Sequence, residues 1–190
     1  MKPINKTIRV FAPASSANLG CGFDVMGMAL DGIGDVLRIA ISEGDGLTIR
    51  NASAAELPED IEKNVITPAV RAFMAAAGKK ACLEIVVEKK IRPGSGIGSS
   101  AASSAAAVFG LNELYGRPFP LPEPVPFAME GEKLISGTAH ADNSAPAVMG
   151  GIVLIRGYQP LDMVRLPVPD SFCFSVIHPH IVVSTKAARD

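Results

Sequence analysis

One stretch constrains the fold of this chain more than any other: residues 92–102, Arg-Pro-Gly-Ser-Gly-Ile-Gly-Ser-Ser-Ala-Ala. It follows an apolar run, residues 83–87, that is typical of a strand, and it opens an alanine-rich segment, residues 101–114, that is typical of a helix. Its three glycines at alternate positions allow positive φ and let backbone N–H groups approach a ligand closely. Its two serines follow where the helix begins, beside the unpaired amides and the positive end of the helix dipole. This order predicts an anion-binding site suited to phosphate, with a tight turn that binds no ligand as the alternative.

Composition indicates a protein that handles small molecules. The 190 residues are 48% apolar, which is enough for a real core, and their 18 basic and 19 acidic side chains nearly cancel. No global field therefore draws the chain to nucleic acid or to an anionic membrane, so an anion must be bound by a local site. The start of the chain lacks the apolar region of a signal peptide, and no run approaches the ~18 apolar residues of a membrane span. We therefore expect a soluble, cytoplasmic protein.

The cysteines are expected to be reduced. Cys21, Cys82 and Cys173 are widely spaced, odd in number and set among apolar neighbours. This pattern favours buried thiols over disulfides or a zinc site.

Strand-like and helix-like segments interleave without strict βαβ alternation, which predicts an α+β fold with a mixed sheet packed with helices. Residues 14–34 and 136–146 are predicted to be polar loops, and residues 35–41 and 47–50 are predicted to pair as a hairpin. The other expected strands are 7–11, 81–88, 152–155, 163–168 and 172–177, and the expected helices are 64–77 (capped by Asn64), 101–114, 127–134 and a start at 182–190.

The glycine loop contains no lysine that could neutralise a bound phosphate, and it is neither a Walker A nor a G-x-G-x-x-G motif. Mg²⁺ would supply the missing positive charge most simply. A serine hydroxyl can ligate Mg²⁺, but a carboxylate normally joins it. Glu130 and Glu132, just before the second polar loop, are the available candidates, and a solvated helix face is the alternative interpretation.

Both polar loops carry side chains suited to a substrate. His140, Asp142 and Asn143 lie within four residues of the second loop, between an apolar helix and an apolar strand. Asn18 and Asp24 lie in the earlier, glycine-rich loop. Amide and carboxylate side chains suit an ammonium or hydroxyl group, whereas ordinary solvated turn residues are the alternative in both loops.

Together these segments resemble the GHMP small-molecule kinases and, within them, the homoserine kinase family. The resemblance is carried by Val-Phe-Ala-Pro-Ala-Ser-Ser-Ala-Asn-Leu-Gly-Cys-Gly-Phe-Asp-Val-Met-Gly at 10–27, Pro-Gly-Ser-Gly-Ile-Gly-Ser-Ser-Ala-Ala at 93–102, His-Ala-Asp-Asn-Ser-Ala-Pro at 140–146 and Val-Ser-Thr-Lys-Ala-Ala-Arg at 183–189. It covers nearly all of the 190 residues, and the first motif is highly specific. It implies a ribosomal-protein-S5-domain-2-like N-terminal ATP and substrate domain over residues 1–160, then the start of a C-terminal domain over 161–190.

The resemblance implies ATP-dependent phosphorylation of the side-chain hydroxyl of L-homoserine to O-phospho-L-homoserine, in threonine biosynthesis. ATP would be the co-substrate, and Ser100 and Glu132 would hold Mg²⁺. The nucleotide would be bound by Asn64, at the adenine, and by Pro93, Gly94, Ser95, Gly96, Ile97, Gly98, Ser99, Ser100, Ala101 and Ala102. The homoserine pocket would be lined by Asn18, Asp24, His140, Asp142, Thr185 and Arg189, and the catalytic residues would be Asn143 and Arg189.

The family pattern leaves no obvious general base. Many relatives in the superfamily use an Asp base with a nearby Lys, whereas here Asn143 matches the Asp and Ser15 matches the Lys, as in the homoserine kinases. Because Asn cannot accept a proton, catalysis would rest on in-line positioning and on charge stabilisation. The proton would go to the γ-phosphate, with His140 as the alternative base.

The superfamily also carries a third glycine-rich motif in its C-terminal half, and nothing after Gly151 resembles it. We therefore expect the N-terminal part of a longer protein, with very weak activity or none from these 190 residues alone. The alternatives are another GHMP kinase, acting on mevalonate, a sugar or shikimate, or a non-catalytic ATP- and ligand-binding module. No nucleic-acid or membrane partner is expected, and a homodimer is compatible with the pattern.

Overall fold

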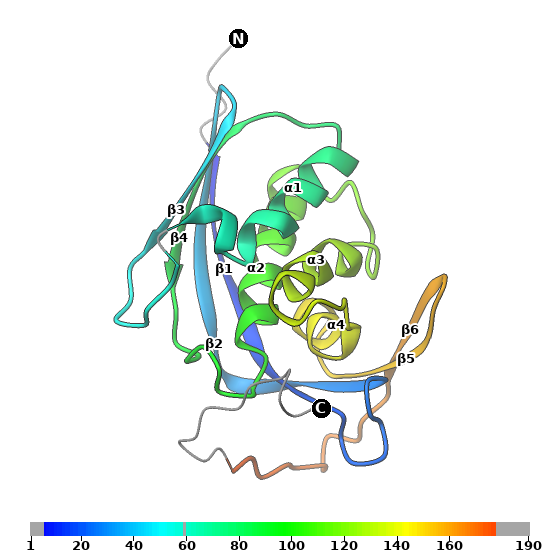
Figure 1. Cartoon of the computed structure of the whole chain (residues 1–190). Coiled ribbons are helices and arrows are strands. Elements are labelled where there is room, and N and C mark those ends of the chain that lie inside the picture. The colour runs from blue at the N-terminus through cyan, green and yellow to red at the C-terminus, as the bar shows by residue number, and fades with distance from the viewer. Residues whose placement is uncertain (1–5, 59, 178–190) are drawn as a thin grey trace.

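The fold is organised around one long strand, β2 (Met26–Ser42), in a computed structural model that describes residues 6–58 and 60–177. Along one edge, β2 pairs antiparallel with β1 (Lys6–Ala17). Along the other edge, its C-terminal part pairs with β4 (Cys82–Glu88) and its N-terminal end with β5 (Ile152–Tyr158), both antiparallel. Because β2 reaches both strands, it joins two halves of one six-stranded sheet (Figure 1).

The remaining strands extend these two halves. β3 (Gly46–Asn51) runs parallel to β4, and β6 (Leu161–Leu166) runs antiparallel to β5, so the order is β3-β4-β2-β5-β6 with β1 beside β2. The helical elements are the 3-10 turn η1 (Ile61–Lys63), α1 (Ile66–Ala76), α2 (Ser99–Leu114), α3 (Val125–Ser136) and α4 (Ala141–Met149). A parallel pair among antiparallel strands, with helices interleaved, confirms the predicted α+β fold with a mixed sheet.

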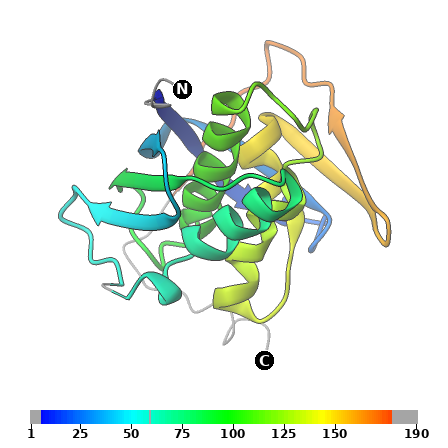
Figure 2. The same ribbon diagram turned by 90° about the horizontal axis from the view of Figure 1, so that it is seen from above.

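The α-helices cover one face of the sheet, with α2 at the centre of the helical layer (Figures 1 and 2). Helix α2 packs against β1 and β2 and against α1, α3 and α4. Most of its residues are buried, as expected for a helix without a distinct polar face. A Cβ on Gly110 of this helix would lie 2.6 Å from the Ile39 side chain of β2. Small residues therefore let the central helix lie close against the sheet.

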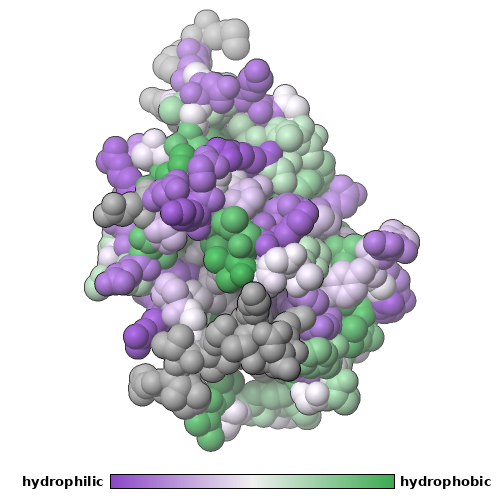
Figure 3. Space-filling view, in the orientation of Figure 1, coloured by the Kyte–Doolittle hydropathy of each residue, from purple (hydrophilic) through white to green (hydrophobic). Residues whose placement is uncertain are grey.

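Hydrophilic and hydrophobic residues are interspersed over the face shown in Figure 3. Within the described parts of the chain, no helix combines the length and apolar character needed to cross a membrane.

The first predicted loop, residues 14–34, is mostly strand, because β1 and β2 extend into it and leave only residues 18–25 between them. Gly27 and Gly34, which suggested a loop, serve packing within β2 instead, whereas Gly20 and Gly32 adopt positive φ in open space. A Cβ on Gly27 would collide with the carbonyl oxygen of Asp142 on α4. The loop prediction was wrong here because glycine within a strand can mark the close approach of another backbone.

The predicted hairpin between residues 35–41 and 47–50 is also wrong, since β3 pairs with β4 and not with β2. Over residues 36–41, β2 is already paired with β1 on one edge and β4 on the other. No edge of β2 is therefore left for β3, which joins the sheet by parallel pairing with β4.

The second predicted loop, residues 136–146, overlaps a helix. Helix α4 begins within it and carries Asp142 and Asn143 in its first turn. Pro146 suggested a loop but lies inside the helix. Because proline has no N–H, the Asp142 carbonyl four residues earlier is free of the helical hydrogen bond and can lie against Gly27.

Near the end of the described chain, the prediction of a strand over residues 172–177 is wrong, because this segment pairs with no strand that the structure describes. β6 begins and ends two residues before the predicted 163–168. The predicted helix start at 182–190 lies outside the described residues. A domain boundary after residue 160 stays a prediction, and it would pass through the turn of the β5–β6 hairpin.

The cysteines are less buried than predicted. Cys21 and Cys173 are exposed and Cys82 is half-buried, and all three are free thiols. The expectation of burial was wrong for the first two because they lie in the 18–25 loop and in the unpaired segment near residue 173.

Candidate active site

The glycine loop, residues 92–98, lies at the lower end of the sheet in Figure 1, between β4 and α2. Helix α2 begins at Ser99, directly after the loop and two residues before the predicted start. Gly98 has a φ of 66° and no side chain, so no capping side chain covers the first amides of the helix. An uncapped helix start presents N–H groups and a positive dipole end to an anion. The predicted order of strand, glycine loop, serines and helix is confirmed.

A buried lysine, Lys89, lies between the end of β4 and the glycine loop, and it was not predicted as part of the site. The Lys89 ammonium donates to the Asp35 carboxylate, to the Ser99 carbonyl oxygen at 2.5 Å and to the Ser103 hydroxyl at 2.8 Å. The side chains of Lys89 and Asp35 are only 3% and 0% exposed. Burial lowers the pKa of Lys89, while the charge and hydrogen bond of Asp35 oppose this shift. Because three bonds use all the ammonium donors, Lys89 holds the protein rather than a phosphate.

The second Asp35 oxygen anchors the chain that leads into the loop. It accepts hydrogen bonds from the backbone N–H groups of Lys90 at 2.9 Å and Ile91 at 3.0 Å. The Ser99 hydroxyl donates to the Ile91 carbonyl oxygen at 3.1 Å. The network therefore ties β2, the end of β4 and the start of α2 together. Its only signal in the sequence was a basic pair, Lys89 and Lys90, at the end of a strand.

Glu132 on α3 lies beside the first turn of α2. Burial raises the pKa of Glu132 and the charge of Asp142 adds to this, whereas hydrogen bonding to Ser100 and the charge of Lys89 lower it. The Glu132 Oε1 atom is buried, and among the described residues it has no hydrogen-bond partner. A buried carboxylate oxygen that lacks a partner, next to a serine hydroxyl, is a good fit for a bound cation.

The two candidate glutamates differ in their surroundings. The Glu130 side chain is 42% exposed and lies 3.8 Å from the Lys133 ammonium. Across the residues that the structure covers, no group of three His, Cys, Asp or Glu side chains is arranged to hold a metal ion. Mg²⁺ needs only one or two carboxylates when phosphate oxygens and water complete its shell. Ser100 and Glu132 therefore fit a Mg²⁺ that arrives with a nucleotide.

Helix α4 brings Asn143 to the glycine loop. The Ser15 hydroxyl of β1 donates to Asn143 Oδ1 at 2.8 Å, and the Ser15 backbone N–H donates to the Ile97 carbonyl oxygen at 3.1 Å. A Cβ on Gly98 would collide with the Ser15 hydroxyl and lie 3.0 Å from Asn143 Oδ1. The predicted phosphate loop and the predicted catalytic amide are thus joined through Ser15.

A second polar cluster lies at the end of the 18–25 loop. Asp24 Oδ1 and His140 Nδ1 are 3.7 Å apart, and about a quarter of each side chain is exposed (24% and 22%). Asn18 Oδ1 accepts from the Asp24 N–H at 2.9 Å. The Tyr158 hydroxyl donates to the Asp24 carbonyl oxygen at 2.8 Å and accepts from the Ala141 N–H at 3.3 Å. Tyr158 was missed because nothing in its local sequence links it to either loop.

The other predicted site residues have structural partners or lie outside the described chain. Asp142 is buried, and its Oδ1 accepts from the next N–H of α4 at 3.0 Å. Asn64 is buried, and its Oδ1 accepts at 3.0 Å from the N–H two residues later, where α1 begins. Thr185 and Arg189 lie outside the described residues.

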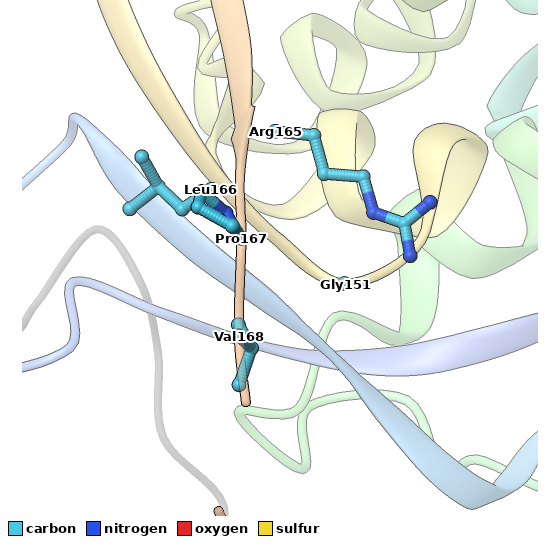
Figure 4. A pocket seen from close by; sticks show the side chains of 5 residues that line it. All are labelled: Gly151, Arg165, Leu166, Pro167 and Val168. Atoms are coloured by element: carbon cyan, nitrogen blue, oxygen red, sulfur yellow. The ribbon is translucent and has the colours of Figure 1, made fainter. Parts of the chain in front are cut away.

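A surface hollow of about 340 Å³ lies away from these clusters, between β6 and the turn that follows α4 (Figure 4). It is lined by Gly151, Arg165, Leu166, Pro167 and Val168. A Cβ on Gly151 would lie 2.7 Å from Arg165 Nε, so the guanidinium lies close to the C-terminal end of α4. A cation there stabilises the helix dipole, and the hollow contains none of the predicted site residues.

Comparison with known proteins shows what the chain is similar to. Residues 64–151 match the model of the GHMP kinases N terminal domain. A homoserine kinase of Natronomonas pharaonis is 46% identical over 182 residues, which are 96% of this chain and 59% of that relative. A homoserine kinase of Chlorobium phaeobacteroides is 40% identical over 196 aligned positions, covering 97% of this chain and 61% of that relative. The chain thus spans about three fifths of the curated relatives it matches.

Solved structures show the same similarity. The crystal structure of a homoserine kinase from Cytophaga hutchinsonii superposes with a TM-score of 0.87 at 43% identity, over 100% of this chain and 61% of that one. The Methanococcus jannaschii mevalonate kinase, at 17% identity and a TM-score of 0.65, shares the fold over 86% of this chain and 56% of its own. Residues 64–151 therefore match the N terminal domain of the GHMP kinases, and the chain as a whole is similar to about three fifths of the homoserine kinases that it matches.

Proposed function

We propose that this chain is the ATP- and substrate-binding part of a kinase that transfers the γ-phosphoryl group of ATP to the side-chain hydroxyl of L-homoserine. The observation that carries the proposal is the contact between the glycine loop and Asn143 through Ser15. It brings the loop that would bind phosphate to Asn143, near the start of the helix that His140 precedes, so that donor and acceptor groups could meet as a phosphotransferase needs. The relatives that the chain matches are homoserine kinases, and they suggest the acceptor.

On the nucleotide side, the amides at the start of α2 and in the glycine loop would bind the phosphates of ATP. Ser100 and Glu132 would hold Mg²⁺, which fits the buried Glu132 oxygen that lacks a partner among the described residues. When bound, Mg²⁺ neutralises the charge of the phosphate oxygens. Asn64 would contact the adenine, in line with the family resemblance. Its buried position at the start of α1 places it close to α2, because the Ser104 hydroxyl of α2 bonds the carbonyl oxygen of the adjacent Val65 at 3.2 Å.

On the acceptor side, the Asp24 carboxylate would bind the ammonium group of homoserine, with His140 and Asn18 beside it. Asp24 is partly exposed, so a ligand can reach it without unfolding the cluster. Asp142 would position Asn143 at the start of α4, because its side chain accepts a hydrogen bond from the Asn143 N–H. Thr185 and Arg189 would bind the substrate carboxylate or the transferring phosphoryl group, as the resemblance implies.

The transfer forms a bond between the substrate hydroxyl oxygen and the γ-phosphorus, and it breaks the bond from that phosphorus to the β–γ bridging oxygen, which leaves as ADP. The Asn143 amide cannot accept the hydroxyl proton but can donate N–H groups to the phosphoryl oxygens. The hydroxyl proton would therefore pass to the transferred phosphate. Catalysis would depend on in-line positioning and charge stabilisation, without a protein general base.

The test is phosphate transfer from γ-labelled ATP to a panel of acceptors: L-homoserine, mevalonate, galactose and shikimate. From residues 1–190 alone we expect at most weak labelling, of L-homoserine only, together with calorimetric binding of L-homoserine and of Mg·ATP. When the chain is joined to the C-terminal part of a homoserine kinase that it matches, labelling of L-homoserine should rise. A preference for another acceptor would contradict the proposed substrate. Binding of ATP and homoserine without turnover in the joined protein as well would support the alternative of a non-catalytic module and overturn the kinase proposal.

We extend the proposal to a cytoplasmic protein, as expected for an enzyme that uses ATP and a free amino acid. A homodimer stays a prediction, and sedimentation equilibrium of the chain would test it.

A further inference from the structure

We propose that Ser15 is a positioning residue that fixes the side-chain amide of Asn143, so that its N–H groups, and not its oxygen, face the transferring phosphoryl group. This inference rests on the proposed function and adds a residue that does not itself touch the substrate. It concerns a single hydrogen bond, from the Ser15 hydroxyl to Asn143 Oδ1 at 2.8 Å.

The location of Ser15 makes this hydrogen bond specific. Ser15 lies at an irregularity of β1, where the pairing register with β2 shifts between Pro13 and Ser15. Its side chain is fully buried, so the hydroxyl needs a protein partner. Asn143 provides that partner. An asparagine amide carries its oxygen and its NH₂ group on opposite sides, so holding the oxygen at Ser15 turns the two N–H donors away from Ser15.

The glycine loop also contacts Ser15 and Asn143. The Ser15 N–H donates to the Ile97 carbonyl oxygen at 3.1 Å, which attaches the loop to β1. Gly98 packs so tightly that a Cβ there would collide with the Ser15 hydroxyl and lie 3.0 Å from Asn143 Oδ1. The amide is therefore enclosed on its oxygen side, next to the loop that would hold the phosphates.

The orientation of this amide has a chemical consequence. N–H donors directed at the phosphoryl group stabilise the negative charge that it carries in the transition state. A flipped amide would present its oxygen, an acceptor, to phosphate oxygens and would repel them. Asn143 is also held at its backbone, because its N–H donates to Asp142 Oδ1 at 3.0 Å. With the backbone fixed, the flip of the terminal amide is the main freedom left, and Ser15 controls it.

The test compares Ser15→Ala with a matched control, Ser144→Ala. Ser144 lies next to Asn143, is fully buried, and its hydroxyl has no hydrogen-bond partner among the described residues. Measured in the chain joined to the C-terminal part of a matching homoserine kinase, Ser15→Ala should lower kcat for homoserine phosphorylation by about ten- to a hundredfold, the cost of a displaced catalytic group, with KM values unchanged. Ser144→Ala should change neither parameter. Adding Ser15→Ala to Asn143→Ala should cause no further loss, because the two residues act as one unit.

A second measurement, by NMR, detects the hydrogen bond between Ser15 and Asn143 and does not require turnover. In the ¹⁵N-labelled chain, Asn143→Asp identifies the Asn143 side-chain NH₂ signals by their loss. Ser15→Ala should shift these signals, and Ser144→Ala should leave them in place. If Ser15→Ala does not fold, Ser15→Cys keeps the shape with a weaker donor and should shift them in the same direction. Unshifted Asn143 signals, or a change in KM with kcat preserved, would overturn the inference. Shifted signals in a chain that binds neither ATP nor L-homoserine would support the hydrogen bond while refuting the proposed function.

Discussion

The nucleotide side and the acceptor side of the candidate site are held in place by different contacts. On the nucleotide side, the buried ion pair of Asp35 and Lys89 connects the end of β4 to the start of α2 through hydrogen bonds. At the acceptor side, Asp24 and His140 are partly exposed and 3.7 Å apart, and the cluster is tied to β5 through the Tyr158 hydroxyl. The first arrangement is buried and hydrogen-bonded within the protein, so we expect it to be rigid with or without a ligand. The second leaves charged groups open to solvent, where they can adjust to an acceptor.

The difference suggests which part of the site would determine the acceptor. A phosphate-binding loop must hold several N–H groups in fixed positions toward the ligand, and buried hydrogen bonds can fix the backbone in this way. An acceptor site can vary with its loops, because residues such as Asn18 and Asp24 lie in a connection and not in the core. Changes on the nucleotide side should therefore affect folding as well as binding, whereas changes on the acceptor side should affect binding alone.

The largest effect is expected from Asp35→Ala, because it leaves the Lys89 charge buried without its partner. We expect the free energy of unfolding to fall by about 3–5 kcal/mol, measured by urea denaturation. The exposed pair of Arg9 and Glu88, 3.4 Å apart, is the matched control. Glu88→Ala should cost no more than about 1 kcal/mol. Equal costs for the two variants would contradict a rigid nucleotide side.

Glu132→Gln should separate ligand binding from folding. We expect the Mg²⁺-dependent part of ATP affinity to fall at least about tenfold by calorimetry, because the proposed metal ligand would be lost. Without Mg²⁺ the thermal midpoint should stay the same or rise, since burial of the Glu132 charge is unfavourable. Glu130→Gln, at an exposed position, is the control and should change neither value. Unchanged Mg²⁺ dependence in Glu132→Gln would remove this residue from the metal site.

The raised pKa of Glu132, caused chiefly by burial, predicts a pH dependence. Protons compete with Mg²⁺ for this carboxylate, so Mg²⁺-dependent ATP binding should weaken as pH falls through that raised pKa. Stability without metal should change in the opposite sense. A group whose pKa is raised on folding stabilises the fold at low pH and loses that contribution as pH rises through the folded-state pKa. Both dependences should vanish in Glu132→Gln, and their persistence there would assign them to another group.

The smallest effect is expected from Asp24→Asn. It should weaken homoserine binding about tenfold, in line with the loss of a hydrogen bond to a charged group, while ATP affinity and unfolding free energy stay within error. Asp31→Asn is the control, because Asp31 is exposed and its Oδ1 accepts from the neighbouring Gly32 N–H at 2.9 Å. A large loss of stability in Asp24→Asn would mean that the acceptor side is structural.

Local patterns predicted the parts of this molecule that local forces build. The glycine loop, the alanine-rich helix after it and the strand before it follow from backbone freedom, side-chain size and periodicity over short windows. The polar residues Asn18, Asp24, His140 and Asn143 were also named from composition and family resemblance. The structure does bring Asp24 to His140 and Asn143 to the glycine loop.

Features that depend on distant partners were not predictable in the same way. Whether β3 pairs with β2 or β4 depends on which strand edges remain free after β1 and β4 have paired. The bond between Lys89 and Asp35 joins residues 54 positions apart, and that between Ser15 and Asn143 spans 128 positions. Such contacts depend on how the whole sheet is assembled, and no local pattern marks them.

The contrast between the two sides can be measured directly by amide hydrogen exchange in the free chain. The N–H groups of Lys90 and Ile91 donate to buried Asp35, whereas those of Asp24 and Ala141 donate within the partly exposed cluster. We predict exchange at least about a hundredfold slower for the first pair, as expected for amides that open only with the core. Adding L-homoserine should slow the second pair alone. Equal exchange in the two pairs, or protection by homoserine at Lys90 and Ile91 only, would contradict a rigid nucleotide side beside an adaptable acceptor side.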